Sequence, residues 1–110
     1  MKNIAPTVAQ IIRQFAQEIK QLLRENLIAE YLFGSYATDT QTALSDIDIL
    51  ILVRQATPDL QRQISGLASD YSLMYDLYIS PMLEDMTVWE KNQRCQTLFY
   101  RNVIQQGIPL

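Results

Sequence analysis

The stretch FGSYATDTQTALSDIDILILV, Phe33 to Val53, decides how this chain is interpreted. It begins with an apolar residue and Gly34-Ser35, continues through ten mostly polar residues, and enters an isoleucine-rich run that starts with Asp46 and Asp48. Two carboxylates two residues apart in a strand point to the same face. At a separation of ~4 Å they repel by roughly 1 kcal/mol in water and about 4 kcal/mol at an effective dielectric near 20. The pair therefore needs solvent exposure, a raised pKa on one carboxylate, or a divalent cation between them.

The two halves of this stretch suggest a metal–phosphate site. The run after Asp48 is so apolar that exposure fits only at its entrance, where the two carboxylates can share one or two Mg²⁺ ions. Protein-bound Mg²⁺ usually completes its shell with water and substrate phosphate. Glycine lets the backbone approach a phosphate closely, serine adds a hydroxyl, and a helical start presents free N–H groups. We therefore predict that Gly34 and Ser35 bind a triphosphate and that Asp46 and Asp48 bind the metal.

Asp76 is the candidate for a third carboxylate. It lies in LMYDLYI, an otherwise apolar run that we interpret as the middle of a third strand. If that strand lies beside the second, Asp76 reaches the same rim. It would then ligate a second metal and accept the proton of an attacking hydroxyl in a two-metal phosphoryl displacement.

The pattern along the rest of the chain predicts one α/β (α+β) domain over residues 1–110, with a small mixed sheet flanked by helices. Apolar residues at three- and four-residue spacing after Pro6 predict a first helix. Thr57-Pro58 and Ser80-Pro81 each resemble a helix cap followed by proline, and Gly107 is typical of a helix end. The elements expected after the first helix are strands over Leu27–Phe33 and Asp46–Val53, a helix from about Ala56 to Asp70, a strand over Tyr71–Ser80, and helices from Pro81 to about Asn92 and from about Cys95 to Gln106.

Composition excludes several classes of site and partner. The chain has no histidine and one cysteine, so we expect neither the usual zinc site nor an internal disulfide. The single cysteine also leads us to expect the reducing environment of the cytoplasm. The net charge is −3 with scattered basic residues, so direct nucleic-acid binding is not expected. No signal peptide or membrane span is expected, because the N-terminus and the longest apolar run, Ile49–Val53, are too weakly apolar or too short.

The motifs together resemble the nucleotidyltransferase superfamily typified by DNA polymerase beta, and within it the minimal MNT domains. The shared pattern is a hydrophobic residue with Gly-Ser, a spacer, acid-hydrophobic-acid, and a later third acid. Here it stands as FGS, ten residues, DID and YDL. The motif SDIDILI and the C-terminal sequence LFYRNVIQQGI also look like those of MNT proteins, so the resemblance covers nearly the whole chain.

The resemblance implies a nucleotidyltransferase fold and transfer of AMP from ATP to a hydroxyl, with release of pyrophosphate. It implies Mg²⁺, with two ions expected, and ATP as substrate. Minimal MNT proteins are commonly antitoxins that bind a HEPN ribonuclease toxin, so a hetero-oligomer with such a toxin and AMP transfer to a toxin tyrosine are expected. Carried over, Gly34 and Ser35 bind triphosphate, Asp46 and Asp48 bind Mg²⁺, and Asp76 is the third ligand and base.

One departure from the family keeps alternatives open. Many members continue after Gly-Ser-x-Ala with Arg-Gly, whereas this chain has Thr38-Asp39. The change removes a cation near the phosphates and adds an acid. A catalytically weak or inactive antitoxin that acts by binding alone is one alternative, and a small-molecule nucleotidyltransferase is another. Among the tyrosines Tyr71, Tyr75 and Tyr78, sheet packing is the default interpretation and base stacking the alternative.

Overall fold

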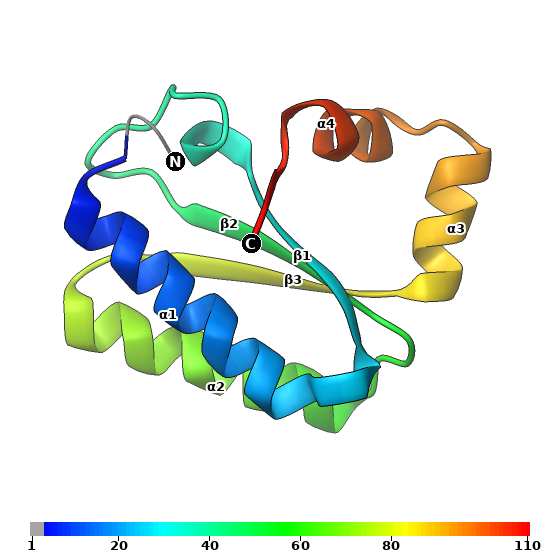
Figure 1. Cartoon of the computed structure of the whole chain (residues 1–110), viewed down its shortest axis with the longest axis horizontal. Coiled ribbons are helices and arrows are strands. Elements are labelled where there is room, and N and C mark those ends of the chain that lie inside the picture. The colour runs from blue at the N-terminus through cyan, green and yellow to red at the C-terminus, as the bar shows by residue number, and fades with distance from the viewer. Residues whose placement is uncertain (1–3) are drawn as a thin grey trace.

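The computed structural model describes residues 4–110, which form a four-stranded sheet with two pairs of helices (Figure 1). The strand order is β3-β2-β1-β4; β2 runs parallel to β3 and antiparallel to β1, and β4 is antiparallel to β1. The predicted mixed sheet with flanking helices is therefore confirmed. The elements are α1 (Pro6–Leu23), η1 (Arg24–Asn26), β1 (Leu27–Phe33), η2 (Gly34–Tyr36), β2 (Ile47–Val53), α2 (Pro58–Tyr75), β3 (Ile79–Asp85), α3 (Met86–Arg94), α4 (Leu98–Gln106) and β4 (Ile108–Pro109).

The sheet separates two apolar layers, and β2 contributes to both. Ile47, Ile49, Ile51 and Val53 pack with α1 and α2, which lie together on one side of the sheet in Figure 1. Leu50 and Leu52 of β2 pack on the other side of the sheet with α3 and α4, where Trp89 and Val103 are also buried. β2 lies between β3 and β1 and has buried residues in both layers. Each of its fully buried aliphatic side chains contributes about 1.5–3 kcal/mol to the stability of the fold.

The predicted third strand, Tyr71–Ser80, is wrong. Helix α2 continues to Tyr75, and Ile64, Ala68 and Tyr71 share its buried face at helical spacing. The strand follows, from Ile79. Tyr71 and Tyr75 at the start of this segment therefore belong to the inner face of a helix, whereas Leu73 and Met74 are exposed on its outer face.

The predicted helix from Pro81 to Asn92 is also wrong in its first half. Ser80 and Pro81 lie in β3, an edge strand of the described sheet, where proline is tolerated because one side of the strand needs no ladder partner. The real cap of α3 is Asp85, whose carboxylate accepts a hydrogen bond from Thr87 N at 2.9 Å. The predicted cap at Thr57 is confirmed, since its hydroxyl accepts from Leu60 N at 3.1 Å.

The turn between α2 and β3 is closed by one serine. The Ser72 hydroxyl donates to Ala68 O at 2.8 Å and accepts from Ile79 N at 3.2 Å. Ile47 N also donates to Tyr78 O at 2.7 Å, which ties this turn to the entrance of β2. Together these bonds bring the beginnings of β2 and β3 side by side.

Within residues 4–110, none of the helices has the length and hydropathy that a membrane span requires.

Candidate active site

Gly34 and Asp48, from the two halves of the opening stretch, are in direct contact. Phe33 at the end of β1 pairs with Asp48 of β2, so the chain turns beside that carboxylate. Gly34 makes the turn with φ of 74°, in the left-handed region that favours glycine. A Cβ at Gly34 would collide with the Asp48 carboxylate oxygen Oδ2. The position therefore requires glycine both for its backbone conformation and for the room that Asp48 occupies.

The segment after Gly-Ser folds back on η2. Ala37 N and Thr38 N donate to Gly34 O at 3.1 and 3.3 Å, and the Thr38 hydroxyl donates to the same oxygen at 3.3 Å. Asp39 follows with φ of 59°, a left-handed conformation that aspartate tolerates better than most residues. The departure from the family's Arg-Gly is thus accommodated by a hydroxyl that closes the turn and an aspartate that takes the position of glycine.

The acid pair lies at the entrance of β2, as predicted, although the strand begins at Ile47 and leaves Asp46 just outside it. Burial, and secondarily the charge of Asp46, raise the pKa of Asp48 above its ordinary value. Both causes act by penalising the charged form of Asp48. Among residues 4–110, no group of three or more acidic, histidine or cysteine side chains is placed to hold a metal. The arrangement fits a cation held by two carboxylates, with water and phosphate completing its shell.

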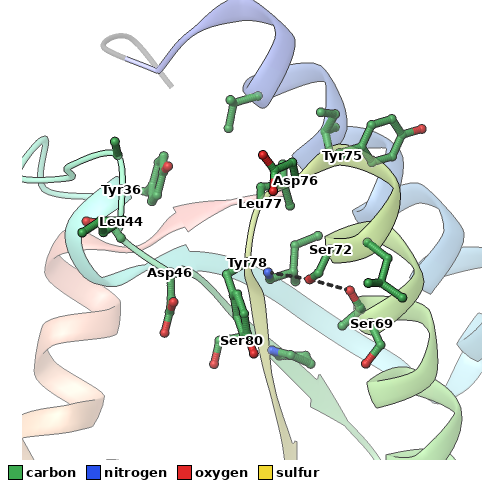
Figure 2. Close-up of a pocket in the computed structure, with 18 of the residues that line it drawn as sticks. Tyr36, Leu44, Asp46, Ser69, Ser72, Tyr75, Asp76, Leu77, Tyr78 and Ser80 are labelled. Atoms are coloured by element: carbon green, nitrogen blue, oxygen red, sulfur yellow. Dashed lines mark hydrogen bonds between the residues drawn. The ribbon is translucent and has the colours of Figure 1, made fainter.

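Asp76 does not lie in the middle of a strand, and that prediction is wrong. It ends α2 in a left-handed conformation, with φ of 52° and ψ of 48°. Figure 2 shows Asp76 beyond the last turn of α2, on the wall of a groove that Asp46 and Ser80 also line. The role predicted for Asp76 depended on a strand position that it does not have.

A groove of about 1230 Å³ adjoins the acid pair between the end of α2, the start of α1 and the beginning of β3. From the opening stretch, Tyr36 and residues 43–46, which include Asp46, line it, and Gly34, Ser35 and Asp48 do not. Tyr78 lines it too and is 69% exposed (Figure 2). The groove is thus a neighbouring space that reaches the acid pair through Asp46.

Ser80 was missed as a residue of this site. It pairs with Asp48 across β2 and β3 and also lines the groove. Its only signal in the sequence was Ser-Pro, which we interpreted as a helix cap. The residue before proline favours an extended conformation, and this was the clue to a strand.

The comparisons with known proteins identify the family of this chain. The model of the family "Polymerase beta, Nucleotidyltransferase" matches residues 17–110. Two curated relatives come from Methanocaldococcus jannaschii. "Putative protein adenylyltransferase MJ0141" is 39% identical over 74% of this chain and 83% of its own length. MJ0604, which carries the same description, is 32% identical over 87% of this chain and 90% of its own.

Two solved structures share the fold. The crystal structure of a toxin–antitoxin with AMP-PNP aligns at 30% identity and a TM-score of 0.53, over 84% of this chain and 69% of that chain. A mutant of the toxin–antitoxin MntA-HpeT aligns at 31% identity and a TM-score of 0.52, over 86% of this chain and 70% of that one. The predicted family is confirmed: the chain belongs to the polymerase beta nucleotidyltransferases.

Proposed function

We propose that this nucleotidyltransferase is an antitoxin that transfers AMP from ATP to a tyrosine hydroxyl of a cognate HEPN toxin, in a Mg²⁺-dependent reaction. The observation that carries the proposal is the contact between Gly34 and the Asp48 carboxylate, since it joins the proposed phosphate-binding turn to the proposed metal site. The similarity to protein adenylyltransferases supports the chemistry. The similarity to toxin–antitoxin structures, one of them with AMP-PNP, supports the biological role.

The reaction exchanges a phosphoanhydride bond of ATP for a phosphoester bond to the acceptor. The acceptor oxygen forms a bond to the α-phosphorus, the bond from that phosphorus to pyrophosphate breaks, and the hydroxyl proton passes to solvent water. Gly34 keeps the backbone turn free of a side chain so that a phosphate can approach, and Ser35 offers its hydroxyl as a donor. Asp46 and Asp48 would hold a Mg²⁺ ion, which when bound neutralises charge on the phosphates.

The acid pair is suited to a cation because, among residues 4–110, neither Asp46 nor Asp48 is in an ion pair with a base. Burial and the neighbouring carboxylate raise the pKa of Asp48. Arg62 is in an ion pair with Asp59, and Lys20 is in one with Glu30, so these two bases serve other acids. A divalent cation removes the repulsion between Asp46 and Asp48, and the site therefore gains from loading.

A labelling experiment tests the transfer. The protein and its toxin are incubated with Mg²⁺ and ATP labelled at the α-phosphate, and the label is expected on the toxin. ATP labelled at the γ-phosphate is the matched control and should leave the toxin unlabelled. Asp48→Asn should abolish labelling, whereas Asp59→Asn, which changes an exposed carboxylate of α2, should not.

A binding-only antitoxin is the second candidate, and one observation favours it. The part of the chain that the structure describes does not gather a third carboxylate at the acid pair. This candidate predicts an unlabelled toxin, and toxin neutralisation that survives Asp46→Asn combined with Asp48→Asn. Label on the toxin together with loss of neutralisation in the double variant would rule it out in favour of the transferase.

A further inference from the structure

Ser80 is the residue that the neighbouring strand places beside Asp48. The two are direct partners in the parallel pairing of β2 and β3. Paired strands lie about 4.8 Å apart, and paired residues in parallel strands direct their side chains to the same face. On that face β2 continues from Asp48 to Leu50, which packs toward α3 and α4.

The position of Ser80 is open to a ligand. Strand β3 is at an edge of the described sheet, and Ser80 lines the groove that also reaches Asp46. Asp46 and Ser80 are both among the side chains that line this groove in Figure 2. Asp46, Asp48 and Ser80 therefore lie at the beginnings of β2 and β3.

No acid of β3 is near enough to Asp46 and Asp48 to act as a third carboxylate of the site. The first carboxylate of the strand is Glu84, four residues beyond Ser80, where it accepts a hydrogen bond from Asn92 at 3.2 Å. At about 3.3 Å per strand residue, Glu84 lies roughly 13 Å further along. Asp76 lies four residues before Ser80, on the α2 side of the turn.

We propose that Ser80, and not Asp76, completes the catalytic set beside Asp46 and Asp48, so that the site holds a single divalent cation. This inference rests on the proposed Mg²⁺-dependent transfer. Two carboxylates match the charge of one Mg²⁺, and a second ion needs a further anionic ligand that Ser80 does not supply. The Ser80 hydroxyl serves as a hydrogen-bond partner for a phosphate oxygen or for water on the cation, and β3 then offers the acceptor hydroxyl no carboxylate base beside Asp48.

Manganese binding to the whole chain, without nucleotide or toxin, tests the assignment. Electron paramagnetic resonance counts the bound Mn²⁺ ions and gives their affinity. Ser80→Asp is expected to raise Mn²⁺ affinity by at least about tenfold and to add a second ion, since it restores a third carboxylate. Ser80→Asn, of similar size but neutral, is the matched control for the added charge and should leave the number of bound ions at one.

Asp76→Asn distinguishes the two candidates without altering Ser80. We expect Mn²⁺ binding equal to that of the unmodified chain, and a large loss of affinity in Asp76→Asn would overturn the assignment. Unchanged binding in a folded Ser80→Asp protein would also overturn it. If Ser80→Asp fails to fold, as judged by circular dichroism, the Mn²⁺ affinity of Asp76→Asn alone decides between Ser80 and Asp76.

The same titration separates failure of this inference from failure of the proposed function. Binding of Mn²⁺ that needs Asp48 and also Asp76 would leave the proposed function standing and remove only the role of Ser80. Binding that is indifferent to both Asp48 and Ser80 would contradict the metal site itself, and with it the inference.

Discussion

Glu30 and Asp48 are two acids on opposite faces of the same sheet, and their surroundings differ in charge. Glu30 of β1 pairs with Ile51, on the face that packs with α1 and α2, and is 3% exposed. Asp48 lies at the entrance of β2 on the other face. Burial raises the pKa of both carboxyls above their ordinary values.

The difference lies in the neighbour of each acid. Lys20 Nζ lies 3.7 Å from Glu30 Oε2 and partly offsets the burial by lowering the Glu30 pKa. The neighbour of Asp48 is another acid, Asp46, which adds to the effect of burial. An acid beside a base is a structural feature, whereas an unbalanced pair of acids is poised to take a cation. Substitutions at and around the two acids separate these roles.

The largest effect is expected for Asp48→Asn. Removing one charge should lower AMP transfer by at least about 100-fold, a loss typical of a group that stabilises transition-state charge. The fold should persist, because the substitution relieves repulsion with Asp46. Transfer rate and thermal unfolding are measured on the same samples; an active Asp48→Asn protein would contradict the catalytic role.

Glu30→Gln should change stability and leave transfer intact. The pKa of Glu30 is raised from 4.5 to about 7 in the folded chain, so the folded state binds more protons than the unfolded state between these values. Stability therefore falls as pH rises through this window, by on the order of 2–3 kcal/mol for a shift of this size. Urea unfolding from pH 4.5 to pH 8 should show this loss in the unmodified chain and a much flatter profile in Glu30→Gln. Equal slopes in the two proteins would contradict this account of Glu30.

Gly34→Ala should destabilise the chain and disturb Asp48. Alanine at φ of 74° costs about 1–2 kcal/mol, and its Cβ would also displace the Asp48 carboxylate. We expect lower stability together with weaker binding of AMP-PNP and Mg²⁺, measured by calorimetry. Loss of stability with unchanged binding would show that the contact between Gly34 and Asp48 does not shape the site.

The smallest effect is expected for Gly66→Ala, a matched control for the same substitution. Gly66 lies inside α2, where an added Cβ would meet nothing within 4 Å. Alanine is favoured over glycine inside a helix by roughly 0.5–1 kcal/mol, so thermal unfolding should shift upward. Destabilisation here would mean that α2 is packed more tightly at this point than the structure shows.

The opening stretch was predictable because its local signals agree with its surroundings. Gly34 is the residue that a left-handed turn favours, and Asp48 lies near the start of a strand whose residues alternate between two buried layers. The segment from Tyr71 to Asp85 was not predictable in the same way. Tyr71 and Tyr75 have high strand propensity but lie on the inner face of α2, where Tyr71 packs edge-on against Phe15 at 5.3 Å. Tertiary packing, and not the strand propensity of its residues, determines that the start of this segment is helical.

The error in this segment also misplaced a site residue. Shifting the strand from Tyr71–Ser80 to Ile79–Asp85 takes Asp76 out of the sheet and brings Ser80 beside Asp48. That pairing joins residues distant in sequence and depends on where α2 ends, which local signals did not define. Glu30 was missed because an acid in LIAEYLF carries no sign of the lysine that faces it from α1.

Binding of AMP-PNP with and without Mg²⁺, measured by calorimetry in two variants, tests most directly whether the entrance of β2 holds the metal. We expect Asp46→Asn combined with Asp48→Asn to lose the dependence on Mg²⁺, while Glu30→Gln binds as the unmodified chain does. Magnesium-dependent binding that survives in the double variant would contradict a metal site formed by Asp46 and Asp48.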